Sequence, residues 1–160
     1  MSTPSLLDAV RIVKENERVA SDNYAEASRK VDHSRSKVLF EQLSEFEQYH
    51  FEKLSALEAS LEKSGGFIPY EGKELKLPPI FEIRAAQEPD RKTIMQIISA
   101  ALDLEEESEK AYSDLANRIS DKHGREMFKR LAEEEHKHFQ TLTDVYWTLT
   151  NLGTWQYSQT

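Results

Sequence analysis

The sequence predicts an all-α protein, a single bundle of four long helices. Three observations support this prediction: apolar residues recur at helical spacing over four stretches, one long connector separates the second stretch from the third, and the second pair of stretches repeats the first. The chain has 160 residues, of which 38% are hydrophobic. That size and composition suit one domain over residues 1–160 with one continuous core.

The first pair of predicted helices covers residues 4–31 and 34–63. Pro4 follows Thr3 as a first-turn proline after a capping residue, and Gly65 and Gly66 end the second helix. The second pair covers residues 90–119 and 122–149, followed by a short irregular tail at 150–160. At a rise of about 1.5 Å per residue, rods of roughly 30 residues are about 45 Å long and span the whole domain.

Residues 65–89 form the connector. They contain four of the five prolines and three of the five glycines, and they show no sustained hydrophobic period. An extended connector of about 25 residues can reach about 80 Å, enough to run the length of the bundle. Short turns near residues 32 and 120 make each helix pair an antiparallel hairpin. The predicted order is therefore up, down, long crossover, down, up.

The composition excludes several functions. A formal net charge of −8 argues against a nucleic-acid backbone or an anionic membrane surface as the main partner. Because there is no cysteine, disulfides, thiol catalysis and iron–sulfur clusters are excluded, and any metal must be bound by oxygen and nitrogen. No apolar run reaches the roughly 18 residues of a membrane span, and the first residues lack the layout of a signal peptide. We therefore expect a cytoplasmic protein.

The second hairpin repeats the first at an offset of 88 residues. Such self-similarity marks two copies of one helical hairpin. The residues that coincide are Glu17 and Glu105, Tyr24 and Tyr112, Phe40 and Phe128, Leu43 and Leu131, Glu47 and Glu135, His50 and His138, Phe51 and Phe139, and Leu54 and Leu142.

Each copy carries one Glu before its turn and a Glu-x-x-His motif equally far after it, so these groups lie at one level of the hairpin. Glu47 and His50, at i and i+3, share the helix face of Leu43 and Leu54 and therefore replace core residues. Four carboxylates inside a bundle would cost several kcal/mol per unpaired ion. Two divalent cations balance their charge, and two neutral imidazoles complete the set. The predicted ligands are Glu17, Glu47, His50, Glu105, Glu135 and His138.

This ligand set resembles that of the ferritin-like diiron carboxylate superfamily, most closely its rubrerythrin (erythrin) branch, over residues 4–149. The resemblance implies that Glu47 and Glu135 bridge two iron ions, with manganese as the other suitable metal. It further implies that Glu17 and Glu105 are terminal ligands and that His50 and His138 bind one ion each. Tyr24 and Tyr112 would orient carboxylates by hydrogen bonds, although they could equally be core aromatics.

The same resemblance implies a peroxidase that acts against oxidative stress by reducing H₂O₂, with O₂ as the other possible oxidant. Electrons would come from a separate rubredoxin-like or flavin protein, since this chain has no cysteine. One departure is that Ser108 stands where peroxidase-type rubrerythrins carry an additional Glu, and Glu109 is the alternative for an extra ligand. We expect a homodimer, because the tail is too short for the fifth helix of a storage cage.

Two other functions remain open on the sequence. One is a ferroxidase that oxidises and sequesters iron, and the other is a bundle that binds metal structurally without turnover. Glu133 and His136 form a rival pair, but Lys129 and Gln140 share their face, which indicates solvent exposure. His33 and His123 fall in turns or first helical turns and are expected at the surface.

Overall fold

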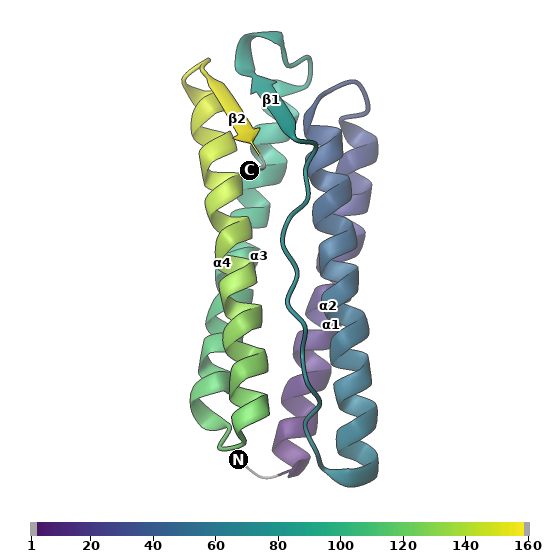
Figure 1. Cartoon of the computed structure of the whole chain (residues 1–160). Coiled ribbons are helices and arrows are strands. Elements are labelled where there is room, and N and C mark those ends of the chain that lie inside the picture. The colour runs from purple at the N-terminus through teal and green to yellow at the C-terminus, as the bar shows by residue number, and fades with distance from the viewer. Residues whose placement is uncertain (1–2, 159–160) are drawn as a thin grey trace.

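The computed structural model describes residues 3–158 and shows a mostly helical chain (Figure 1). This described part contains four long α-helices of 28 or 29 residues each: α1 Thr3–Lys30, α2 Ser36–Ser64, α3 Arg91–Arg118 and α4 Lys122–Thr150. Every predicted helix end lies within two residues of the observed one. The prediction of an all-α four-helix bundle is confirmed.

Local sequence explains where two of these helices end or begin. Gly65 follows α2 with φ = 75°, a left-handed conformation that glycine adopts without strain, and its N–H donates to the Leu61 carbonyl at 3.0 Å. The Asp121 carboxylate caps α4 by accepting from the Gly124 N–H at 3.0 Å. A Cβ on Gly124 would lie 2.8 Å from the Phe67 ring, so glycine lets the connector pack closely there.

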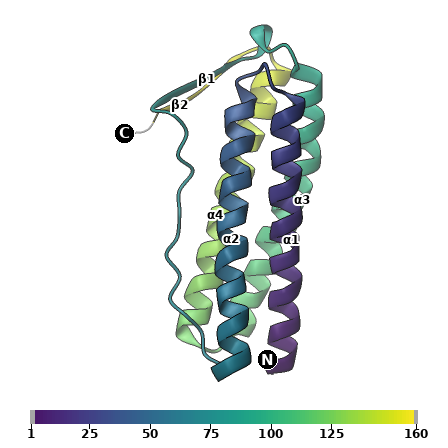
Figure 2. The ribbon, with the colours of Figure 1, turned by 90° about the vertical axis from the view of Figure 1, so that its right-hand side faces the viewer.

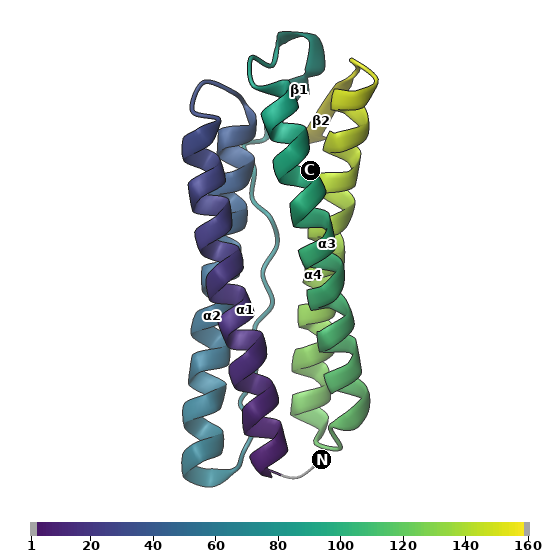
Figure 3. The same ribbon diagram turned by 180° about the vertical axis from the view of Figure 1, so that it is seen from behind.

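The two helical hairpins are α1 with α2 and α3 with α4, and within each hairpin the helices pack along their whole length (Figure 1). In this view α1 and α4 run upward, whereas α2 and α3 run downward. The crossover between α2 and α3 climbs the length of the bundle over the face formed by α2 and α4 (Figures 1 and 2). The opposite face is formed by α1 and α3 (Figure 3).

A short two-stranded antiparallel sheet lies at one end of the bundle, where irregular structure was expected. Strand β1, Ile80–Arg84, pairs with β2, Thr154–Ser158, and a short 3-10 helix, η1 Ala85–Gln87, follows β1. Ile83 is opposite Trp155, and the Trp155 ring meets the Phe81 ring edge-on at 6.0 Å. The prediction of an irregular tail at 150–160 is therefore wrong for β2, because pairing with the crossover satisfies its backbone groups.

Among the residues that the structure describes, the hydrophobic core consists of two clusters separated by a polar layer. The first surrounds the α1–α2 turn, and the second surrounds the α3–α4 turn. On all four helices the Glu and His residues of the repeat fall between these clusters: on α1, for example, Glu17 lies between Val13 and Tyr24. The apolar clusters thus hold the four helices at the spacing that places the polar layer.

In the part of the chain that the structure describes, no helix has the length and apolar character needed to cross a membrane.

Candidate metal centre

The six predicted ligand residues lie together in the middle of the bundle. They come from all four helices: Glu17 from α1, Glu47 and His50 from α2, Glu105 from α3, and Glu135 and His138 from α4. None is more than 3% exposed. Burial of four carboxylates and two imidazoles in one layer is costly unless their charges are balanced there.

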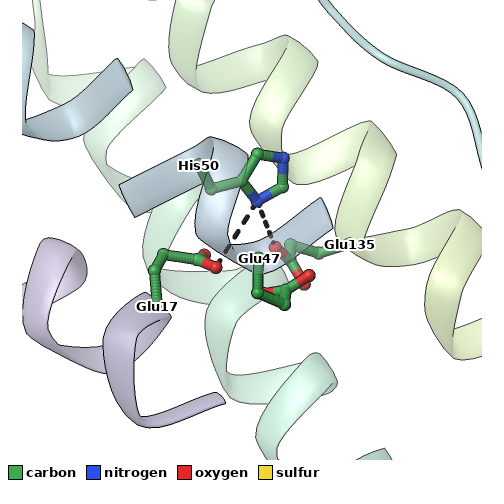
Figure 4. A group of neighbouring side chains, drawn as sticks. All are labelled: Glu17, Glu47, His50 and Glu135. Carbon is green, nitrogen blue, oxygen red and sulfur yellow. Dashed lines mark ion pairs between the residues drawn. The ribbon is translucent and has the colours of Figure 1, made fainter. Parts of the chain in front are cut away.

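Within residues 3–158, these side chains form two groups of four, and in each group the potential ligand atoms lie within 4.8 Å of one another. One group is Glu17, Glu47, His50 and Glu135, shown in Figure 4; the other is Glu47, Glu105, Glu135 and His138. Glu47 and Glu135 belong to both. Either group could hold a metal ion, and two shared carboxylates between two groups is the arrangement of a dinuclear centre.

Both imidazoles direct Nδ1 into the centre. His50 Nδ1 lies 2.9 Å from Glu135 Oε1 and 3.5 Å from Glu17 Oε2 (Figure 4). His138 Nδ1 lies 3.0 Å from Glu47 Oε1 and 3.7 Å from Glu105 Oε2. Each histidine therefore faces the shared carboxylate of the other hairpin, which ties α2 to α4 at this level.

The buried charges perturb one another strongly. Burial raises the pKa of Glu47 well above its usual range, and the charge of Glu135 raises it further. Burial also opposes ionisation of Glu17, but its hydrogen bond with Glu47 and the charge of His50 lower the Glu17 pKa to about 2. For His50, the effect of burial is outweighed by the Glu17 charge and a hydrogen bond with Glu134, which raise its pKa to about 10. Without metal, the layer is therefore neutralised by protons.

Several polar atoms at the centre lie at ion-pair distance from one another but make no hydrogen bond among the described residues. They are one oxygen each of Glu17, Glu47 and Glu105, both oxygens of Glu135, and Nδ1 of both histidines. Buried polar groups are nearly always satisfied, so a cluster of unsatisfied acceptors that converge on one place needs an explanation. Metal ions could satisfy these atoms, because carboxylate oxygen and imidazole nitrogen are suitable ligands for first-row metals.

Two tyrosines connect the hairpins beside the centre. The hydroxyl of Tyr24 on α1 donates to Glu105 Oε1 on α3 at 2.6 Å, and the hydroxyl of Tyr112 on α3 donates to Glu17 Oε1 on α1. Both phenols are buried, and burial together with these carboxylate charges raises their pKa well above the usual value. They therefore stay protonated and fix the orientation of Glu17 and Glu105, in addition to packing in the core.

Glu134 is a buried residue that the sequence interpretation missed. It is 1% exposed, and its Oε1 lies 3.2 Å from His50 Nε2. The crossover donates to the same carboxylate through the Tyr70 hydroxyl and through the Lys73 N–H at 3.0 Å. A carboxylate behind a histidine fixes the ring and its tautomer when the other nitrogen binds metal. The hydrogen-bond network around Glu134 thus links the crossover to His50.

His138 has no equivalent of this carboxylate behind it, because Phe46 of the first hairpin occupies the position 88 residues before Glu134. The Phe46 ring instead meets the His138 ring edge-on at 4.3 Å. Among the described residues, His138 Nε2 has no hydrogen-bond partner. The two halves of the centre are thus alike in their inner ligands and different behind their histidines.

The remaining candidates lie outside both groups. Glu109 Oε1 is 2.7 Å from His136 Nδ1, and both side chains are partly exposed, so the structure gives no support to Glu109 as an extra ligand. Glu133, His33 and His123 are exposed, as expected from the sequence.

Comparisons with known proteins bear on the fold alone. No protein-family model and no curated protein matches the chain. A solved structure of a hypothetical protein from Pyrococcus furiosus is similar, with a TM-score of 0.66 and 21% sequence identity over 92% of each chain. At this identity the similarity shows that the same arrangement of helices occurs in another protein.

Proposed function

We propose that this protein is a ferritin-like, non-haem diiron protein of the rubrerythrin type that reduces hydrogen peroxide. One observation carries the proposal: two groups of buried ligands share Glu47 and Glu135 and leave converging acceptors without hydrogen bonds. The path of the chain supports it as well, since two hairpins joined by a crossover along the bundle is one of the known arrangements of ferritin-like folds.

The four carboxylates and two imidazoles suit two Fe(II) or Mn(II) ions, and we propose iron. Glu47 and Glu135 would hold both ions, Glu17 and His50 one, and Glu105 and His138 the other. When bound, a pair of iron ions supplies the two electrons that reduction of an O–O bond requires. The two apolar clusters flank the site along the bundle, and Tyr24 and Tyr112 hold Glu105 and Glu17 in place.

We propose that the electrons come from a separate electron donor. The chain has no cysteine and therefore cannot itself hold a rubredoxin-type iron site. A rubredoxin-like or flavin donor would have to reduce the centre again after each turnover. We also propose a homodimer, and light scattering of the purified protein tests that part directly.

The proposed activity is tested by loading the protein anaerobically with two equivalents of Fe(II) and mixing it with H₂O₂ or O₂ in a stopped-flow instrument. We expect the optical change of iron oxidation to be much faster with H₂O₂. Rapid oxidation by O₂ with ferric iron retained in the protein would instead support a ferroxidase. Reaction with neither oxidant would indicate a structural metal site.

A further inference from the structure

A pocket of about 330 Å³ lies between α1 and α3 and reaches the candidate metal centre. Its inner end is formed by the buried side chains of Glu47, Glu105, Glu135 and Tyr24. Neither Glu17 nor His50 lines it. The pocket therefore approaches the half of the centre that contains Glu105, and the two shared carboxylates, but not the other half.

The walls of this α1/α3 pocket are mostly apolar and small. They are formed by Val19, Ala20, Ala27, Ile97, Ala101 and Leu104. Ala20 and Ser108 both line the pocket, and each lies three residues after a predicted ligand Glu. They occupy equivalent positions in the 88-residue repeat. Two short side chains at these equivalent positions leave the gap between α1 and α3 unfilled.

On the other face of the bundle, the crossover covers the same level and leaves a more polar pocket, which reaches His138 but none of the four carboxylates of the centre. There the crossover lies over α2 and α4, where the Tyr49 hydroxyl donates to the Glu71 carbonyl at 2.6 Å and the Lys73 N–H donates to Glu134 at 3.0 Å (Figures 1 and 2). The α1/α3 face carries no such cover in the part of the chain that the structure describes (Figure 3). The α1/α3 pocket is the more apolar of the two and reaches three carboxylates of the centre, so it is the better route for an apolar substrate.

The size and polarity of the α1/α3 pocket indicate which class of substrate fits it. Its volume is about ten times the ~30 Å³ that a water molecule occupies in the liquid, and it lies within the range of organic-ligand pockets. Hydrogen peroxide alone needs neither that volume nor apolar walls. At the exposed mouth, Glu26 and Glu107 outnumber Lys30, which disfavours an anionic ligand such as a carboxylate.

We propose that the α1/α3 pocket binds small, uncharged organic hydroperoxides and that these are substrates of the centre. This inference rests on the proposed peroxidase function. The organic group would contact the apolar walls, and the O–O group would lie at the inner end beside Glu105. One hydroperoxide, two electrons from the external donor and two protons give one alcohol and one water, with cleavage of the O–O bond.

The test compares cumene hydroperoxide with H₂O₂ as oxidants of the Fe(II)-loaded protein. Ala20→Leu should fill the pocket and lower the ratio of kcat/KM for cumene hydroperoxide to that for H₂O₂ by about tenfold or more, the usual effect of altered fit in an apolar pocket. Ala100→Leu changes an exposed residue at the mouth of the pocket, where a larger side chain does not disturb the core, and should lower the same ratio. Ala59→Leu makes the same change at an exposed position of α2 outside the pocket and should leave the ratio unchanged.

Binding is measured separately from activity. The redox-inactive, zinc-loaded protein should show saturation-transfer NMR signals from cumyl alcohol, the product of cumene hydroperoxide, and Ala20→Leu should abolish them. Oxidation by H₂O₂ with no reaction of cumene hydroperoxide would overturn the inference and leave the proposed function standing. An equal effect of the pocket variants on both peroxides would also overturn it. Two bound irons that react with neither peroxide would overturn both proposals.

Discussion

Glu134 is hydrogen-bonded to His50, which belongs to one of the two ligand groups. Its replacement should therefore weaken the binding of one metal ion and leave the binding of the other unchanged. Its carboxylate lies 3.2 Å from His50 Nε2, whereas His138 faces Phe46. Loss of a group behind a metal-bound histidine typically costs 10–100-fold in metal affinity. In Glu134→Gln the amide oxygen can still accept from His50 and Tyr70, but the NH₂ group cannot accept from the Lys73 N–H and the charge is lost. We therefore expect about tenfold, or ~1.4 kcal/mol, for the ion held by His50.

The assay is a competition titration of the metal-free protein with Co(II) against a chelator, which resolves two stepwise binding constants. Glu133→Gln is the matched control, since it makes the same change at the neighbouring, exposed residue and should alter neither constant. An equal loss at both steps, or no loss at either, would refute the inference that Glu134 makes the two metal positions inequivalent.

Three further predictions concern stability and the crossover. In the metal-free protein, His50 has its pKa raised from 6.5 to about 10, so the stability that it contributes is complete below pH 6.5 and is lost as the pH rises to 10. Calorimetry should show the Tm of the metal-free protein falling over that range, and a metal-loaded protein with the same fall would contradict the assignment. Tyr112→Phe removes the donor to buried Glu17 and should lower the free energy of unfolding by about 1–3 kcal/mol in denaturant titrations; no change would show that the hydrogen bond is unimportant. Trp155→Ala removes the ring contact with Phe81 and should speed limited proteolysis of the crossover while helical circular dichroism is preserved; unchanged cleavage would mean that β2 does not hold the crossover.

The sequence allowed the helices and the polar layer to be predicted for one physical reason. A residue that faces the core recurs at the same helical spacing as the apolar residues around it. Glu47 and Glu135 are therefore recognisable as charged residues within the apolar stripes of α2 and α4. The 88-residue repeat then selected Glu105 from several neighbouring acidic residues, and the structure places Glu105 with the other five residues at the centre.

The same repeat gave no indication that Glu134 is buried. It lies in a run of three Glu residues, where composition gives no indication of which is buried, and its counterpart Phe46 breaks the correspondence between the hairpins. Its partners Tyr70 and Lys73 come from the irregular crossover, whose path has no periodic signal. Only the three-dimensional structure brings these residues together.

The small sheet was missed for a different reason. Strands β1 and β2 have five residues each and are about 70 residues apart in the chain, so no hairpin turn indicates that they pair. The alternation of buried Phe81 and Ile83 with less buried neighbours is too short to distinguish from a loop. Tertiary contact between the crossover and the tail decides their conformation.

The central claim is that Glu47 and Glu135 hold two metal ions between them. Anaerobic titration of the metal-free protein with Fe(II), followed by metal analysis of the desalted protein, should give two ions per chain. Glu47→Ala combined with Glu135→Ala should abolish this binding, whereas Glu45→Ala combined with Glu133→Ala, an exposed pair related by the same repeat, should retain both ions. Fewer than two ions in the wild-type protein, or two ions retained without Glu47 and Glu135, would contradict the account.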